Sequence, residues 1–115
     1  MNDDCLFCKI VAGALPSDQV FQDDEITAFR DINPVAPVHI LIIPNKHIGA
    51  ASELRNDDIS LAGRLMLVAR DLAIQEGVSG SGFRLIVNNG PDGGQVVDHL
   101  HLHLIGGQKM RYPMG

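Results

Sequence analysis

The spacing of hydrophobic positions changes several times along the chain, and each change marks a predicted element. Between Cys5 and Gly13 the apolar side chains recur at helical spacing, which predicts a helix of one or two turns. A longer helix is predicted after Asp57 or Asp58, either of which can cap its start, and Gly77 ends it. Its apolar stripe consists of Leu61, Leu65, Val68 and Leu72. We therefore expect one short helix at the start of the chain and one long helix near its middle.

Short runs rich in β-branched and aromatic residues predict five strands. They lie at 20–21, 26–29, 39–44, 83–88 and 99–104. The first two flank a short polar stretch and should form a hairpin, whereas the third is almost entirely apolar and ends at Pro44, which is typical of a buried central strand. The resulting order of helices and strands predicts an α+β domain. Its mainly antiparallel five-stranded sheet should be covered on one side by the long helix.

Length, composition and charge limit the classes of protein that need to be considered. A chain of 115 residues can bury a core but is short for two domains, so we expect a single domain over residues 1–115. The net charge of −5 provides no general attraction for nucleic acid, so no nucleic-acid partner is expected. The acidic start is followed by no long apolar stretch, which predicts neither a secretory signal nor a membrane span. We expect a cytoplasmic protein with no membrane partner.

Three of the five histidines alternate with leucines near the end of the chain, at His99, His101 and His103. On a strand, alternate side chains share a face, so the imidazoles should point one way and the leucines the other. Three explanations are open: a strand face that is histidine-rich by chance, a zinc site, and nucleophilic catalysis at phosphorus by a neutral imidazole. Three histidines in strict alternation favour a functional site over chance.

The only cysteines, Cys5 and Cys8, are three positions apart. In a reducing compartment such a pair favours a metal or redox site over a structural disulfide. Two thiolates alone do not complete a tetrahedral zinc site, so two further ligands would be needed. An idle thiol pair and a thioredoxin-like redox motif are alternatives, although no βαβ pattern surrounds these residues.

The segment from His99 to Ile105 resembles the alternating signature of the histidine triad nucleotide-binding superfamily. The likeness continues, in order along the chain, at 29–34, 36–44, 87–90 and 93–95. It therefore extends over nearly the whole sequence. Gly106 and Gly107, directly after the triad, resemble the purine nucleoside phosphoramidase branch, because dinucleoside polyphosphate hydrolases tend to carry basic residues there.

This resemblance implies a hydrolase that releases a nucleoside monophosphate from purine nucleotide conjugates of AMP or GMP. His101 is the implied nucleophile, forming a nucleotidyl-histidine intermediate that water then cleaves. The implied donors to the phosphate oxygens are His103, His39 and Asn88, together with the backbone amides of Gly94, Gln95 and Val96. Asp31 would accept hydrogen bonds from the ribose hydroxyls. The base would lie in an apolar slot formed by Leu6, Phe7, Ile10, Phe29 and Ile32.

The resemblance also implies a structural zinc ion held by Cys5, Cys8, His47 and His99, and a two-fold homodimer. In that arrangement the metal fixes the N-terminal helix to the sheet and is not required for the chemistry. Three other functions stay open. They are a zinc enzyme whose metal is catalytic, a dinucleoside polyphosphate hydrolase or nucleotidyl transferase of the same superfamily, and a binding module that captures nucleotides without turnover.

Two positions depart from the pattern of the superfamily. Val96 stands where many relatives have a serine whose hydroxyl is thought to assist the leaving group, so the rate or preferred substrate should differ here. Asp98, immediately before the triad, replaces a residue that is commonly aromatic or apolar. We expect its carboxylate to face solvent.

Overall fold

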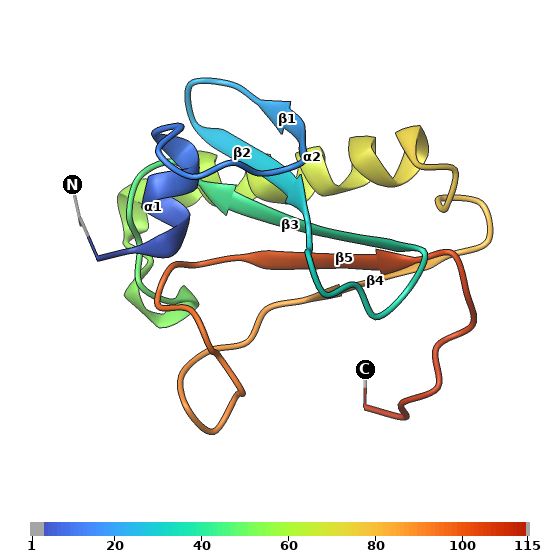
Figure 1. Ribbon diagram of the computed structural model, residues 1–115. Coiled ribbons are helices and arrows are strands. Elements are labelled where there is room, and N and C mark those ends of the chain that lie inside the picture. The colour runs from blue at the N-terminus through green and yellow to red at the C-terminus, as the bar shows by residue number, and fades with distance from the viewer. Residues whose placement is uncertain (1–3, 115) are drawn as a thin grey trace.

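The computed structural model describes residues 4–114, which form a five-stranded sheet, two α-helices and two short 3₁₀ turns (Figure 1). The helices are α1 (Leu6–Val11) and α2 (Ile59–Gln75). The strands are β1 (Gln19–Gln22), β2 (Ile26–Arg30), β3 (Val38–Pro44), β4 (Phe83–Ile86) and β5 (Leu102–Gly106). The 3₁₀ turns η1 (Ala51–Glu53) and η2 (Asn56–Asp58) precede α2.

The strands follow the order β1-β2-β3-β5-β4, and every neighbouring pair is antiparallel. The last strand of the chain therefore lies inside the sheet, between β3 and β4. In this register Leu41 on β3 lies opposite His103 on β5, and Ile42 lies opposite Leu102. The predicted α+β fold with a mainly antiparallel five-stranded sheet is confirmed.

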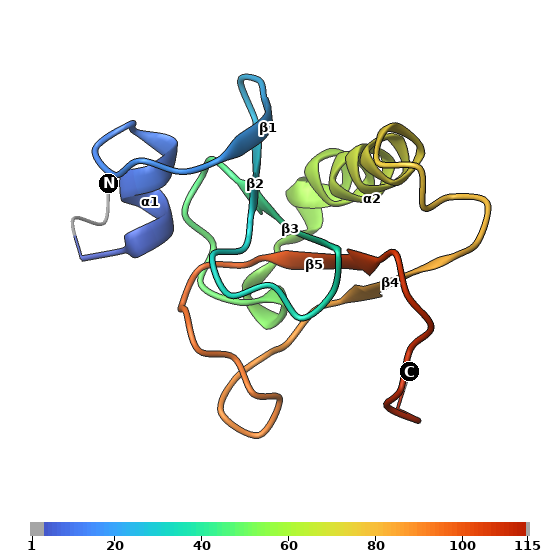
Figure 2. The ribbon, with the colours of Figure 1, turned by 45° about the vertical axis from the view of Figure 1, so that its right-hand side comes forward.

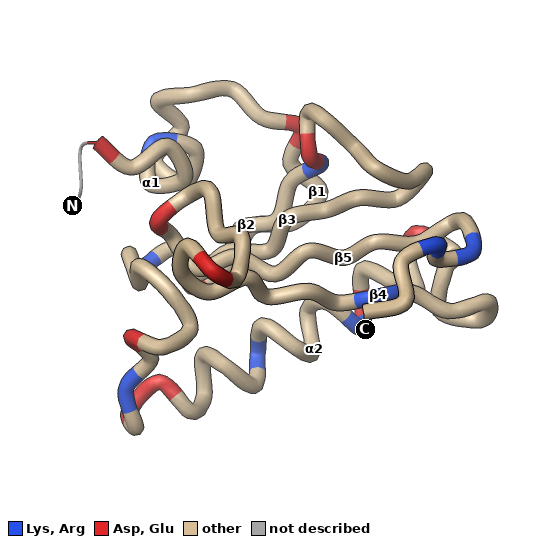
Figure 3. Tube along the Cα trace, turned by 90° about the horizontal axis from the view of Figure 1, so that it is seen from below, with Lys and Arg blue, Asp and Glu red and all other residues tan. Residues whose placement is uncertain are grey.

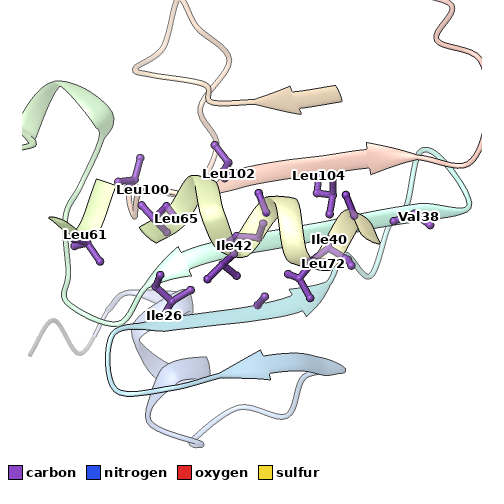
Figure 4. Packing of buried hydrophobic residues seen from close by; sticks show 14 of the residues in the cluster. Ile26, Val38, Ile40, Ile42, Leu61, Leu65, Leu72, Leu100, Leu102 and Leu104 are labelled. Atoms are coloured by element: carbon purple, nitrogen blue, oxygen red, sulfur yellow. The ribbon is translucent and has the colours of Figure 1, made fainter. Parts of the chain in front are cut away.

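The two helices cover opposite faces of the sheet. Along β3, Ile40 and Ile42 belong to the main core, whereas Leu41 and Ile43 pack with α1. Because alternate residues of a strand point to opposite faces, α1 and α2 must lie on different sides (Figure 2). The predicted stripe of α2 forms one side of this main core, as Figure 4 shows for Leu61, Leu65 and Leu72. All seven residues of β3 are buried, which agrees with its nearly continuous apolar sequence.

The structure corrects the predicted limits of the last two strands. β4 ends at Ile86 instead of residue 88, and β5 begins at Leu102 instead of His99. The reason is that pairing between β4 and β5 stops at Ile86 and His103. Beyond this pair the two strands separate, and the long loop joins them. The alternation of side chains nevertheless continues backwards from the strand. The leucines at 100, 102 and 104 all enter the main core, whereas the histidine rings at 99 and 101 contact Phe7 of α1.

The start of α2 also differs from the predicted cap. Asp58 immediately precedes the helix, but its carboxylate makes no capping hydrogen bond to the amides of α2. It accepts instead from the backbone amide of Arg55 at 2.8 Å and from Nζ of Lys46 at 2.7 Å. Gly77 follows the helix with a φ of +75°, as expected for a residue that ends one.

Acidic and basic residues occur on most sides of the trace (Figure 3). No helix in the described part of the chain has both the length and the apolar character needed to cross a membrane.

Candidate active site

A pocket of about 440 Å³ opens between α1, the end of β2 and the histidine-bearing segment. Its volume lies in the range of small-molecule sites. The residues of the expected base slot all line it, namely Leu6, Phe7, Ile10, Phe29 and Ile32. Asp31, Val96, His101 and His103 line it as well. The fold thus gathers side chains from distant parts of the sequence around one cavity that is apolar at one part of its wall and carries two imidazoles at another.

The aromatic ring of Phe7 connects the apolar wall to the histidines. Its centroid lies 5.4 Å from that of Phe29, 5.2 Å from that of His101 and 5.9 Å from that of His99, and each pair is edge-to-face. Such geometry is favourable for aromatic pairs. The short helix α1 therefore fixes one side of the pocket against the nucleophile that the sequence predicts.

The backbone fixes the tautomer of His101, which is 3% exposed. Its Nδ1 lies 2.7 Å from the carbonyl oxygen of His99. Because a carbonyl oxygen can only accept a hydrogen bond, the proton of the neutral ring must be on Nδ1. The Nε2 atom is then left with a free lone pair. This is the form of imidazole that can attack phosphorus.

His103 is held in the complementary form by a chain of hydrogen bonds. The backbone amide of Val35 donates to Nδ1 of His39 at 3.2 Å, so the proton of His39 is on Nε2. That Nε2 lies 3.0 Å from Nδ1 of His103 and 3.4 Å from a carboxylate oxygen of Asp31. His103 therefore accepts at Nδ1 and carries its own proton on Nε2. Its ring can present an N–H donor to a ligand.

Burial keeps both members of this pair neutral at physiological pH. It lowers the pKa of His39, and the opposing effect of the Asp31 carboxylate is smaller. Burial also lowers the pKa of His103 to about 4, with further contributions from His101 and His39. A neutral His103 preserves the hydrogen-bond chain described above, since a protonated ring could no longer accept at Nδ1.

Four of the predicted substrate-binding residues are not part of the pocket wall. His39 lies behind His103, and Asn88, Gly94 and Gln95 are likewise absent from the lining residues. The amide of Gly94 donates to the carbonyl of Pro91. The loop that carries these residues is therefore occupied largely with its own hydrogen bonds.

The side chain of Gln95 organises this loop. It donates to the carbonyls of Gly49 and Val97 at 2.8 and 2.9 Å, and it accepts from the amide of Gly90 at 2.8 Å. Its own amide donates to the carbonyl of Gly90. Val96, the next residue, lies on the pocket wall with a side chain that is 89% exposed. Gln95 thus positions Val96 and the approach to the histidines.

The expected metal ligands Cys5, Cys8, His47 and His99 form a cluster whose donor atoms all lie within 4.8 Å of one another. The Sγ atom of Cys5 is 3.2 Å from Nδ1 of His99, and the Sγ atom of Cys8 is 3.2 Å from Nδ1 of His47. Nε2 of His99 lies 2.8 Å from the carbonyl oxygen of Pro44, so it carries the proton and leaves the Nδ1 lone pair facing the sulfur atoms. Two thiols and two imidazoles gathered in this way match the donor set of a structural zinc site.

Sequence reasoning missed several residues of the site. Leu15, Pro16, Ser17, Leu41 and Val97 also line the pocket. Leu41 had a signal, since its position on β3 alternates with core residues, but the loop residues had none. Val35, whose amide sets the tautomer of His39, acts through its backbone and could not be found from its side chain.

Comparison with known proteins agrees with this geometry. The sequence model of the HIT domain family matches residues 12–110. A purine nucleoside phosphoramidase of Escherichia coli (strain K12) is 46% identical over 110 residues, which cover 96% of this chain and 92% of that protein. A HIT-like protein of Synechococcus elongatus is 44% identical over 115 residues, the full length of both chains.

Solved structures show the same likeness. The crystal structure of a HIT family hydrolase from Legionella pneumophila Philadelphia 1 matches with a TM-score of 0.95 and 49% sequence identity, covering 97% of this chain and 100% of that one. The expected family, fold and hydrolase class are thereby confirmed. Because the family model matches most of the sequence and the relatives match nearly all of it, the chain belongs to the HIT domain family.

Proposed function

We propose that this protein hydrolyses purine nucleoside 5′-phosphoramidates, or related nucleotide conjugates, to the nucleoside monophosphate. The observation that carries the proposal is the tautomer of His101, whose Nδ1 proton is held by the His99 carbonyl at 2.7 Å so that Nε2 is free to attack. His101 lines a pocket of nucleoside size. The likeness to a purine nucleoside phosphoramidase supports the same substrate class.

The reaction runs in two displacements at phosphorus. In the first, the Nε2 lone pair of His101 forms a bond to phosphorus while the phosphorus–nitrogen bond of the substrate breaks and the amine leaves with a proton taken from water. The nucleotidyl-imidazolium that results keeps its Nδ1–H on the His99 carbonyl, which stabilises its charge. In the second, water attacks phosphorus and displaces Nε2, and its proton passes to the hydroxide that remained in solvent when the amine was protonated. This restores the neutral ring and releases the nucleoside monophosphate.

Fixed donors stabilise the phosphate during both steps. His103 lines the same pocket, and its Nε2–H would donate to a non-bridging oxygen. Of the three loop amides that the resemblance implies, those of Gly94 and Gln95 donate to the carbonyls of Pro91 and Gly90. Within residues 4–114 the amide of Val96 donates to no backbone carbonyl, so it would be available to a second oxygen. Gly94 and Gln95 would then act by shaping the loop, and His39 by holding the tautomer of His103. Asn88 stays a proposed donor to the phosphate.

The nucleoside occupies the remainder of the pocket. The Oδ1 atom of Asp31 accepts from the amide of Asn33 at 2.8 Å, which holds the carboxylate in place. Held in this way, Asp31 would accept hydrogen bonds from the ribose hydroxyls. The purine base would lie between Phe7, Phe29 and Ile32, the last of which is 90% exposed. AMP and GMP conjugates both fit this description, because apolar walls separate bases only weakly.

Zinc is proposed at the Cys5, Cys8, His47 and His99 cluster, where the thiols lie at the N-cap and within α1 and the imidazoles come from segments next to the sheet. When bound there, it would join α1 to the rest of the protein as a structural cross-link. None of the proposed steps at phosphorus uses it. A cytoplasmic location is also proposed, because a reducing compartment keeps both cysteine thiols available as zinc ligands.

A homodimer is proposed through the outer face of α2. Four large apolar residues on this helix are at least half exposed, namely Ile59 at 77%, Met66 at 54%, Leu67 at 50% and Ile74 at 60%. A second copy of this chain is the proposed occupant, as an apolar patch of this kind is typical of an isologous interface. Sedimentation velocity of the wild type and Met66→Glu should give a dimer and a monomer respectively. A monomeric wild type at micromolar concentration would contradict this arrangement.

The decisive experiment is mass spectrometry of protein quenched during turnover of adenosine 5′-phosphoramidate. Wild type should show an adenylyl adduct, and His101→Ala should show neither adduct nor turnover while keeping its fold by circular dichroism. Loss of turnover after chelation, without any adduct in the wild type, would instead indicate a catalytic metal. Binding of AMP with no turnover of any conjugate would indicate a binding module.

A further inference from the structure

Helix α1 and its N-cap supply residues both to the proposed nucleotide pocket and to the metal cluster, the name used for the ligand group of Cys5, Cys8, His47 and His99. Cys8 on this helix, and Cys5 at its N-cap, belong to the metal cluster. Leu6, Phe7 and Ile10 belong to the pocket wall. A helix of six residues is too short to be stable alone, so its position depends on the contacts it makes with the rest of the protein.

His99 links the same two sites from the other side. Its ring is fully buried and turns Nδ1 towards the sulfur atoms of Cys5 and Cys8, at 3.2 and 3.5 Å. Its backbone carbonyl holds the Nδ1 proton of His101. The residue that would ligate the metal through its side chain therefore orients the nucleophile through its backbone.

Phe7 contacts residues of both sites. It lies between the two cysteines in sequence, and its ring contacts those of both His99 and His101 edge-to-face. Any change that shifts α1 relative to His99 must move this ring, and the ring is part of the wall against which the base would lie. The packing is dense, since Phe7, Cys8 and Ile10 are all buried.

We propose that zinc at this cluster and nucleotide in the pocket bind with positive coupling, each raising the affinity of the protein for the other. Both ligands require the same docked position of α1 and the same orientation of His99. Binding of one ligand stabilises this arrangement, so the second ligand binds to a protein that already has it. The inference rests on the proposed function, which makes a nucleotide the ligand of the pocket. Linkage requires the coupling to be reciprocal.

The direct test measures the affinity of the protein for AMP by calorimetry, in a reducing buffer, with the metal removed and with zinc at saturation. We expect the Kd for AMP to fall about tenfold when zinc is bound, within the usual range of coupling between sites. The reciprocal measurement titrates zinc in competition with a chromophoric chelator. There, saturating AMP should raise the affinity for zinc by the same factor.

Two variants separate coupling from general effects on the helix. Phe7→Ala keeps all four ligands but removes the shared ring, so AMP should bind more weakly and the ratio of its Kd values without and with zinc should fall towards one. Lys9→Ala changes an exposed residue of the same helix and should keep the wild-type ratio. Circular dichroism establishes that each protein is folded with and without metal.

Each remaining outcome contradicts a different statement. Equal AMP affinity with and without zinc in the wild type would overturn the coupling and leave the proposed hydrolase intact. Failure of the protein to bind zinc would overturn the metal site and the coupling together. Failure to bind AMP under either condition would overturn the coupling along with the proposed function on which it rests.

Discussion

His103 should take up no proton in the folded protein until the pH falls to about 4, because burial lowers its pKa and the neighbouring imidazoles lower it further. In the unfolded chain the same ring titrates near its ordinary pKa of 6.5. Between these values the unfolded chain binds a proton that the folded protein does not bind. The contribution of His103 to stability is therefore fully present above pH 6.5 and is lost as the pH falls to about 4.

The structure sets the size of this effect. The interval from 6.5 to about 4 corresponds to roughly 3 kcal/mol of unfolding free energy, at about 1.36 kcal/mol for each pH unit. This value is an upper limit, since His103 is only partly buried and water reaches part of its ring. Protonation would also remove the acceptor at Nδ1 to which His39 donates at 3.0 Å, so the loss of stability and the loss of the donor chain should occur together.

The assay compares urea unfolding of the wild type and His103→Asn between pH 7 and pH 4, both in the same metal-free buffer. The asparagine oxygen can replace Nδ1 as an acceptor but does not titrate. The pKa values of His39 and His99 are also lowered by burial, and both residues are present in both proteins, so their contributions largely cancel in the difference. We expect the wild type to lose up to about 3 kcal/mol more than the variant over this range. Parallel curves for the two proteins would refute the reasoning.

Three further substitutions test the core, the loop and the departure from the family pattern. Leu104→Ala removes a fully buried side chain and should lower the unfolding free energy by about 2–5 kcal/mol in urea titrations, which a loss below 1 kcal/mol would contradict. Gln95→Ala removes three hydrogen bonds that shape the loop and should cost about 1–3 kcal/mol while lowering kcat/KM for the phosphoramidate about tenfold. An unchanged kcat/KM would show that the loop does not position the substrate. Val96→Ser supplies a hydroxyl at the pocket and should raise kcat several-fold for amine leaving groups, with stability within about 0.5 kcal/mol of the wild type. No rise in kcat would mean that a hydroxyl here does not assist the leaving group.

Hydrophobic periodicity by itself determined the elements of this fold and the faces they bury. The stripe of α2 and the apolar run of β3 follow from local spacing, because a helix repeats every 3.6 residues and a strand every two. The strict alternation around His101 likewise separated the imidazoles from the core leucines, and this held even where the segment before Leu102 is not a paired strand. The family resemblance then predicted the base slot, all of whose residues line the pocket, and the four residues of the cysteine–histidine cluster.

The tertiary structure decided what the spacing of side chains cannot express, which is where backbone groups and strands lie relative to one another. Neither the insertion of β5 between β3 and β4 nor the capture of His39 by the Val35 amide has a signature in the side chains of the sequence. The same holds for the double role of His99, whose ring and carbonyl act on different sites. The tautomers of His99 and His103 depend on hydrogen bonds to segments far along the chain, at Pro44 and His39. Those of His39 and His101 depend on backbone groups only four and two residues away, which the sequence does not place against the ring. Near or far in sequence, these partners are brought to the rings only by the folded backbone, which fixes the nitrogen of each ring that carries the proton.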